Sequence, residues 1–478
     1  MLKVSALKSN GLHFIFVTLI VFFSRLPFLL PGYGTDPDAW GVVYVSRQFA
    51  STGEYQVSRF PGSPVQEFIT SLIWEGGPLM LNGLTSLFSG VSAAFLTLSM
   101  RRLGYRKPIL ASLGFALTPV VFINSVNTMD YMWAMAFILG GLYLLLIDKT
   151  SIGGLFLGMA IGCKLTSVVM LLPLGILLLV RTRKLKELLK FVMIASSVGG
   201  LAFLPAYRIY GFKLFKLTDI SPIPIERILT ISTIGVWGAL GLIALGIGGG
   251  YMLICLIKRR DFHLFAQQRP YLSIWILSIV LYTVIFLWHP HESGYLIATV
   301  PFLILVLSEV LNRKVFIIVI VGFLCSSLLL RIHPLSIHLG KPTYFPNPEI
   351  KLLNYSIQVD IFRWRFYIAP FYGPILFDHS QRVYDMQRLE KVISLANVLN
   401  KKSVVVTGWN LPKFAVLTYE KVGSIDYVWL LDEEHIQGYQ EDGFDIYFLP
   451  EMLEVNREVF GIDLQEFGGR PILVNEEF

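Results

Sequence analysis

The sequence is poor in charged residues. They make up only 15% of its 478 residues, whereas soluble globular domains carry about 25%. Hydrophobic residues reach 54% and the mean hydropathy is +0.62, so a soluble fold would expose far more apolar surface than it could bury. The composition therefore excludes an ordinary soluble protein and predicts an integral membrane protein.

Cysteine is also scarce. The three cysteines, Cys163, Cys255 and Cys325, all lie in apolar runs, which excludes a disulfide framework and offers no metal-ligand spacing. The chain has no long internal repeat, which argues against a transporter built from paired halves. It also lacks a basic stripe with interleaved aromatic residues, so its net charge of +7 predicts no nucleic-acid partner.

Long apolar runs recur along the first 331 residues. Each run is close to the roughly 20 residues that cross a bilayer as a helix, and together they predict about eleven transmembrane helices. The predicted spans are residues 11–31, 78–100, 108–124, 130–147, a broken pair over 152–180, 189–206, 229–257, 271–288, 294–311 and 315–331. The expected fold class is therefore mainly α, a polytopic membrane protein.

The basic clusters predict the orientation of these spans. Clusters at Lys3 and Lys8 and at residues 101–107, 181–190, 258–260 and 313–314 fall on one side, which the positive-inside bias makes cytoplasmic. The first apolar run lacks a small-residue cleavage site and reads as a retained anchor. We therefore expect a multi-pass protein of the cell (plasma or inner) membrane, with its C-terminal region outside the cytoplasm.

The composition changes after Arg331. Residues 341–478 hold more charge, and the β-rich runs Ser403 to Thr407 and Tyr427 to Leu431 alternate with helical stretches such as residues 386–400. This alternation predicts a small exterior α/β domain, and nothing in it looks catalytic. The expected division is a transmembrane catalytic domain over residues 1–335 and an exterior soluble domain over residues 341–478.

Two acids, Asp36 and Asp38, directly follow the first apolar run. Carboxylates at the hydrocarbon edge cost free energy unless they face a polar cavity or a partner. The acids begin a long exterior loop over residues 32–77, in which prolines around a glycine form a rigid turn that holds Arg59 and Glu67 near the membrane surface. Ordinary loop chemistry also accounts for such charges, but a long loop with charges in rigid turns favours a functional site.

Two further charges lie at the ends of later spans. Asp130 begins the fourth span, where helix capping is a sufficient explanation, although the same carboxylate can also face the cavity of Asp36 and Asp38. Lys164 interrupts the broken pair after the glycine-rich run of residues 153–162. An intramembrane lysine with no acid nearby in the sequence needs a partner, and a phosphate is the natural one.

The segment from His289 to Tyr295 begins the tenth span and contains His291 and Glu292. It is a weak metal motif, because His-x-His places the two rings on different helix faces and no distant ligand is evident. Polar residues are ordinary at a membrane interface. Together with the other outward loops, these side chains become candidate donors to an anionic ligand.

Taken together, these features resemble the GT-C glycosyltransferases, and within them the protein O-mannosyltransferase and lipid A aminoarabinose transferase type. The resemblance covers residues 12–331. It is carried by the acid pair, the turn Arg59-Phe60-Pro61-Gly62-Ser63-Pro64, the acid of the fourth span, the glycine-rich run ending in Lys164, and the segment from His289 to Pro301. It implies transfer of a sugar from a polyprenyl-phosphate donor to a glycan, lipid or protein acceptor at the outer membrane face.

The resemblance also implies roles for individual residues. An acid of the first exterior loop acts as general base; Asp38 matches best by position and Asp36 is close behind. Ala39 stands where the mannosyltransferase-type motif carries a second, adjacent acid, so both remain candidates. The implied catalytic set is Asp38, Asp36 and Asp130. The implied donor-phosphate ligands are Arg59, Lys164, Arg208, His289 and His291, and the acceptor or orienting residues are Glu67, Glu292 and Tyr295.

A divalent cation is the one cofactor left open by this interpretation. Two alternatives to it also remain. A surface-polysaccharide polymerase or ligase uses similar lipid-linked donors, and a non-enzymatic transporter or flippase of lipid-linked sugars also needs intramembrane charges.

Overall fold

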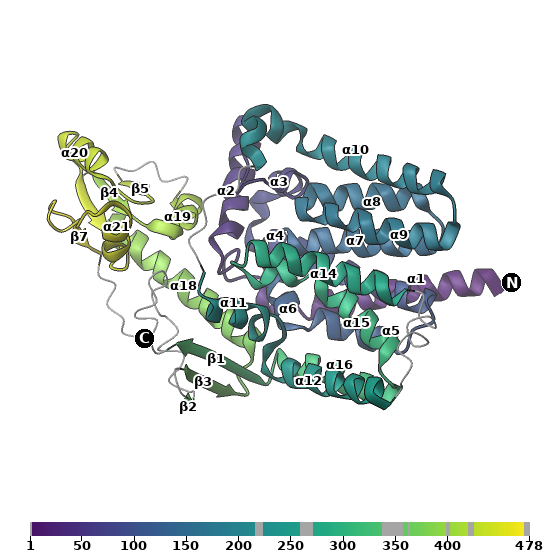
Figure 1. Cartoon of the computed structure of the whole chain (residues 1–478). Coiled ribbons are helices and arrows are strands. Elements are labelled where there is room, and N and C mark those ends of the chain that lie inside the picture. The colour runs from purple at the N-terminus through teal and green to yellow at the C-terminus, as the bar shows by residue number, and fades with distance from the viewer. Residues whose placement is uncertain are drawn as a thin grey trace.

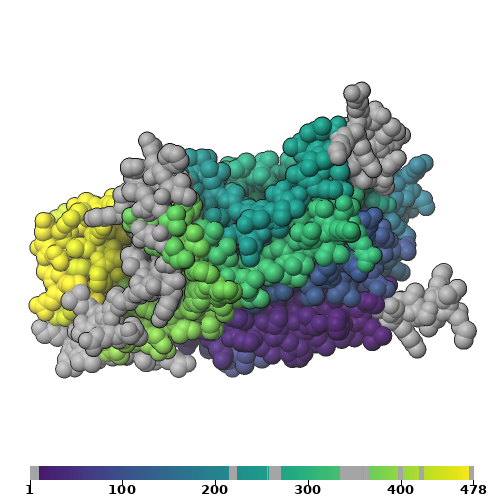
Figure 2. Space-filling model, turned by 90° about the horizontal axis from the view of Figure 1, so that it is seen from below, coloured from purple at the N-terminus to yellow at the C-terminus, as the bar shows by residue number. Residues whose placement is uncertain are grey.

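The computed structural model describes residues 2–215, 223–258, 271–336, 357–361, 364–397, 402–418 and 425–472. In Figure 1 the long helices run side by side, with the N-terminus at one end of the bundle. The described residues from 330 onward, here called the tail, lie at the opposite end. Figure 2 shows the same arrangement from another side, with the last part of the tail in yellow.

Apolar helices occupy every predicted span. They are α1 (Leu2–Phe23), α4 (Gly77–Arg102), α5 (Pro108–Ala116), α6 (Pro119–Ser125), α7 (Tyr131–Leu146), α8 (Thr150–Cys163), α9 (Leu171–Thr182), α10 (Leu185–Tyr210), α12 (Ile234–Lys258), α14 (Leu272–Trp288), α15 (Thr299–Val310) and α16 (Arg313–Ser326). Among the described residues, six helical segments are long and apolar enough to cross a membrane, or up to seven if the bent pair α5 and α6 is one span. The protein is an integral membrane protein; its eleven spans and its sidedness stay predictions.

Local sequence explains where these helices break. Pro108 and Pro119 begin α5 and α6, in the first turn, where the missing N–H costs no hydrogen bond, and the two helices meet at a bend of 68°. The predicted interruption at Lys164 is confirmed. This residue has extended backbone, with φ −152° and ψ 112°, between α8 and the 3-10 helix η3 (Leu165–Met170).

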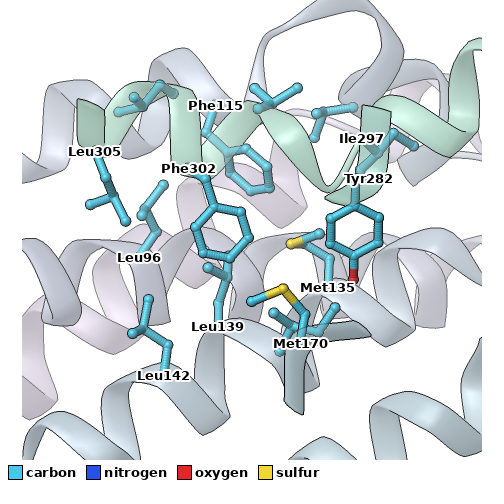
Figure 3. Close-up of a cluster of buried hydrophobic side chains, with 14 of the residues drawn as sticks. Leu96, Phe115, Met135, Leu139, Leu142, Met170, Tyr282, Ile297, Phe302 and Leu305 are labelled. Atoms are coloured by element: carbon cyan, nitrogen blue, oxygen red, sulfur yellow. The ribbon is translucent and has the colours of Figure 1, made fainter. Parts of the chain in front are cut away.

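A single large apolar core joins the helices of the bundle. Figure 3 shows part of it, where Leu96 of α4, Phe115 of α5, Leu139 of α7 and Phe302 of α15 meet, all 0% exposed. The predicted membrane helices therefore pack as one body. This fixes the positions of the helix ends that carry the polar residues discussed below.

Shorter elements join the helices of the bundle. They are η1 (Leu26–Phe28), α2 (Pro37–Thr52), α3 (Pro64–Ser71), η2 (Trp74–Gly76), η4 (Gly211–Phe215), α11 (Ile225–Ser232) and η5 (Ser293–Leu296). Among them, α2, α3 and α11 lie at the tail end of the bundle in Figure 1. Asp36 caps α2 by accepting a 2.9 Å hydrogen bond from the Asp38 backbone N–H, with Pro37 at the first helical position. This sequence order is a typical helix start.

The tail has two sheets. The strands β1 (Leu330–Ser336), β2 (Ile357–Ile361) and β3 (Trp364–Pro370) form an antiparallel sheet in the order β1-β3-β2. The strands β4 (Ser403–Val406), β5 (Ile425–Val428), β6 (Asp445–Phe448) and β7 (Arg470–Pro471) form a parallel sheet in the order β5-β4-β6-β7. The helices are α18 (Pro374–Asn397), α19 (Leu411–Thr418), α20 (Glu433–Glu441) and α21 (Met452–Phe460), with η7 (Gly408–Asn410).

The predicted α/β character of this region is confirmed. The predicted strand at 403–407 matches β4, the run from Tyr427 overlaps the end of β5, and the helix predicted at 386–400 is the second half of α18. The antiparallel sheet was not predicted, and its first strand, β1, crosses the expected domain boundary at residue 335. The two-domain division and the exterior position of the tail stay predictions.

Candidate active site

Arg59 lies between two carboxylates that come from different parts of the chain. Its Nη1 is 2.6 Å from Asp38 Oδ2, at the start of α2. Its Nη2 is 3.2 Å from both carboxylate oxygens of Asp130, just before α7, and Nη1 is 3.9 Å from Glu292 Oε1, just before η5. One guanidinium thus gathers acids from three of the loops that the sequence singles out.

Lys164 lies on the other side of Asp130. Its Nζ is 3.2 Å from both carboxylate oxygens and 3.9 Å from the centre of the Tyr131 ring. The lysine has no acid nearby in the sequence, but the fold gives it Asp130 as a partner in addition to the phosphate expected from the sequence. The break between α8 and η3 gives the ammonium access to an acid 34 residues earlier in the chain.

Asp130 stands at the N-cap position of α7, but its side chain makes no capping hydrogen bond. Its carboxylate, with 6% of the side chain exposed, is bound by Arg59 and Lys164 instead. Capping is therefore not what this acid does. A buried carboxylate held by two cations is an ion network, in which removal of any one charge leaves the others uncompensated.

Tyr131 connects the network to η5. Its hydroxyl donates a 2.7 Å hydrogen bond to Glu292 Oε2. This contact needs Gly294, because a Cβ atom there would lie 2.6 Å from the Tyr131 ring. The glycine lets η5 approach α7 closely enough for Glu292 to join the acids. Tyr295 lies next to Lys164, with the ammonium 5.2 Å from its ring centre.

Three carboxylates meet at one side of this network. Asp36, Asp38 and Glu292 each offer an oxygen, and the three oxygens lie within 4.8 Å of one another. Burial, and then the negative charges of Glu292 and Asp38, raise the pKa of Asp36 to about 7. Oxygen donors in this number suit a hard divalent cation such as Mg²⁺ or Mn²⁺. These three residues are the part of the described chain that could hold the open cofactor.

His289 and His291 lie beside the network, with ring centroids 4.4 Å apart. Burial, and then the charges of His291 and Arg59, lower the pKa of His289 below its usual value. Burial, and then the charge of Arg227, lower that of His291. These shifts favour the neutral form of both rings, and each ring can offer one N–H to an anion.

Two of the candidate residues lie apart from the network. Glu67 is 1% exposed, and its carboxylate accepts hydrogen bonds from the Tyr55 hydroxyl, at 2.5 Å, and from the backbone and hydroxyl of Ser58, at 2.9 and 2.6 Å. These hydrogen bonds of Glu67 fix the backbone next to Arg59. Arg208 lies exposed in the last turn of α10, and none of the ion pairs of the described site includes it.

The sequence interpretation missed Tyr131 and Arg227. Tyr131 follows Asp130 directly, and an aromatic hydroxyl at a predicted cavity was the signal that could have found it. Arg227 lies on α11, and its positive charge acts on His291. The two residues come together only through tertiary packing, so no signal in the sequence alone pairs Arg227 with His291.

Comparisons with known proteins find similarity to solved structures. No protein-family model matches the chain, and no curated protein matches it significantly. Among solved structures, the chain is similar to the crystal structure of ArnT from Cupriavidus metallidurans in the apo state, with 15% sequence identity and a TM-score of 0.41. The match covers 66% of this chain and 60% of that chain. We therefore argue function from the residues of the site.

Proposed function

We propose that this protein is a membrane glycosyltransferase that moves a sugar from a polyprenyl-phosphate donor to a hydroxyl group of an acceptor at the outer face of the membrane. The observation that carries the proposal is the Arg59 bridge: one guanidinium contacts Asp38 at 2.6 Å and Asp130 at 3.2 Å, with Lys164 on the far side of Asp130. A base and anion-binding cations are thus held side by side at the end of a membrane bundle.

Asp38 is the base in this proposal. Its side chain is 36% exposed, the largest fraction among Asp38, Asp130 and Glu292, so an acceptor hydroxyl can approach it. Asp36 is tied to the N-terminus of α2 by its capping hydrogen bond. We assign Asp36 and Glu292 to orienting the acceptor or a divalent cation, together with Tyr295.

The reaction balances with these groups. Asp38 takes the proton of the acceptor hydroxyl as its oxygen bonds to the anomeric carbon of the sugar. The bond from that carbon to the phosphate oxygen breaks, and its electron pair leaves on the polyprenyl phosphate. Arg59 and Lys164 stabilise the charge that gathers on this leaving group, and the neutral rings of His289 and His291 can donate hydrogen bonds to it. The products are the glycosylated acceptor and free polyprenyl phosphate.

The test uses purified protein in detergent with a panel of polyprenyl-phosphate sugars and an acceptor extract. Mass spectrometry of the lipid fraction should detect free polyprenyl phosphate. Asp38→Asn should lower turnover by about 100- to 10,000-fold, because an amide cannot take the proton. The matched control is Asp148→Asn, which removes an acid whose side chain is 63% exposed and pairs with Arg181.

Four outcomes would contradict the proposal or a part of it. Wild-type turnover in Asp38→Asn with an inactive Asp36→Asn moves the base to Asp36, and full activity in the double variant removes the mechanism. Turnover of a nucleotide sugar without a lipid carrier contradicts the donor class. No lipid turnover by the wild type across the panel contradicts the enzyme itself and favours a transporter.

A further inference from the structure

The tail contacts both of the loops that carry the acids of the candidate site. The contact is made by Arg382 of α18, which is 2% exposed. Its Nη2 donates to the backbone oxygen of Phe28 at 2.9 Å, and its Nη1 donates to the backbone oxygen of Val126 at 3.3 Å. Its Nε is 3.0 Å from Asp378 Oδ2, one turn earlier in α18. One buried guanidinium therefore makes three separate contacts.

The two backbone oxygens lie where the acid loops begin. Phe28 ends η1, after which the chain runs to Asp36 and α2. Val126 is the C-cap of α6, after which the chain runs to Asp130 and α7. Arg382 therefore fixes the start of one loop relative to the start of the other.

The same two loops also bond directly to each other. The Thr128 backbone N–H donates to the Tyr33 backbone oxygen at 2.8 Å. Within the first loop, the Trp40 indole N–H donates to the Gly34 backbone oxygen at 2.9 Å. The Thr35 hydroxyl hydrogen-bonds to Asp378, the partner of Arg382. These contacts form one continuous set from α18 to the residue that precedes Asp36.

Apolar packing surrounds this polar set. Ile375 of α18 joins a buried cluster with Leu29, Phe122 and Val126. Met386 of α18 and Leu417 of α19 pack against a second cluster that includes Tyr33 and Trp40. Because the contacts are buried, water does not compete for the guanidinium, and a planar fork with several fixed donors suits it to hold two carbonyls at once.

We propose that Arg382 is a positioning residue of the tail, which holds the loop of Asp36 and Asp38 at a fixed separation from Asp130. The tail is then a working part of the catalytic unit, although nothing in its sequence looks catalytic. The kinetic part of this inference rests on the proposed glycosyl transfer, whereas the loop contact itself does not.

Arg382→Met tests the inference, and Arg388→Met is its matched control. Arg388 lies on the same helix and pairs within the tail with Glu451, at 2.6 and 2.7 Å. Hydrogen exchange of the full-length protein should show faster exchange of the Thr128 amide in Arg382→Met and wild-type exchange in Arg388→Met. Turnover should fall by about 10- to 100-fold through kcat, with little change in the KM for the lipid donor, because misplacement of about 1 Å costs this much.

The outcomes separate the inference from the proposed function. Wild-type exchange of Thr128 in Arg382→Met overturns the loop contact, and faster exchange with unchanged kcat overturns the positioning role. Inactive wild-type protein with faster exchange in the variant refutes the proposed function and leaves the contact standing. Should Arg382→Met not fold, Arg382→Lys keeps the positive charge but cannot bind the Phe28 and Val126 oxygens through two separate nitrogens, so it must also give faster exchange of Thr128; wild-type exchange in it overturns the contact.

Discussion

The ion network of Asp130 makes a quantitative prediction about stability. The Asp130 side chain is 6% exposed and contacts Lys164, which is 13% exposed, and Arg59, which is 21% exposed. Removing one partner from a buried ion pair costs about 3–5 kcal/mol, because the other charge stays buried without compensation. Asp130→Asn leaves Lys164 without its acid, whereas Arg59 keeps its ion pair with Asp38. We therefore expect it to lower the free energy of unfolding by about this amount.

Lys164→Met should cost less, because Asp130 keeps its contacts with Arg59 at 3.2 Å. The double variant Asp130→Asn/Lys164→Met removes a positive and a negative charge together. It should therefore be more stable than the sum of the two single variants predicts, by about 1–3 kcal/mol, as found for residues in direct contact. The measurement is denaturant unfolding of all four proteins in one detergent.

The control is a second double-mutant cycle on the pair Asp148 and Arg181. Their side chains are 63% and 18% exposed, and Arg181 Nη2 lies 3.1 Å from Asp148 Oδ1. Exposed pairs contribute about 0–1 kcal/mol, so this second cycle should show little coupling. Additive effects for Asp130 and Lys164 would refute the reasoning, since they would mean that the two charges are solvated separately in the folded protein.

Two further predictions concern the acids. Gly294→Ala places a Cβ 2.6 Å from the Tyr131 ring, so it should push η5 away from α7 and lower turnover. The control is Gly200→Ala, where a Cβ meets nothing within 4 Å; its turnover should match the wild type. Burial and the charges of Glu292 and Asp38 raise the pKa of Asp36 to about 7, so the folded protein holds a proton that the unfolded chain releases near pH 4. With a chelator present, the contribution of Asp36 to stability should therefore be full below pH 4 and be lost as the pH rises through 7, and Asp36→Asn should remove this part of the pH dependence of thermal unfolding. A cation bound by Asp36, Asp38 and Glu292 would replace that proton, so Mn²⁺ should raise the melting temperature more at pH 8 than at pH 5.5.

Much of the bundle follows from sequence because hydropathy and proline act locally. The break at Lys164 and the helix start at residue 108 depend only on neighbouring residues, and the structure has them where the sequence predicts. The second helix start, at Pro119, divides the span predicted over residues 108–124 and was not predicted. The acids Asp36 and Asp38 were found for the same reason as the break at Lys164. The free energy needed to hold a carboxylate in the membrane depends on its depth in the bilayer, and the hydropathy of the neighbouring residues indicates that depth.

Pairing of the charges could not be predicted in the same way. The contact of Lys164 with Asp130 spans 34 residues and depends on how α7 and α8 rotate about their axes, which an almost wholly apolar surface does not reveal. The link of Arg382 to the two loops was missed because its partners there are backbone oxygens, which carry no sequence signal. Glu67 was found as a charge, but its burial under the turn of Tyr55 and Ser58 is a property of the fold.

The Arg59 bridge bears on how the proposed transfer would avoid hydrolysis of its donor. Asp38 is held by Arg59 at 2.6 Å, so the carboxylate oxygen in this ion pair is occupied by the guanidinium and is not free to bind an acceptor hydroxyl. A phosphate bound to Arg59 and Lys164 competes with Asp38 for the same guanidinium. Donor binding would therefore release Asp38 toward the acceptor, so that the base is available only when there is a sugar to transfer. Arg59→Lys, which cannot contact Asp38 and Asp130 together through two nitrogens, should for this reason raise the ratio of donor hydrolysis to transfer, and an unchanged ratio would contradict this order of events.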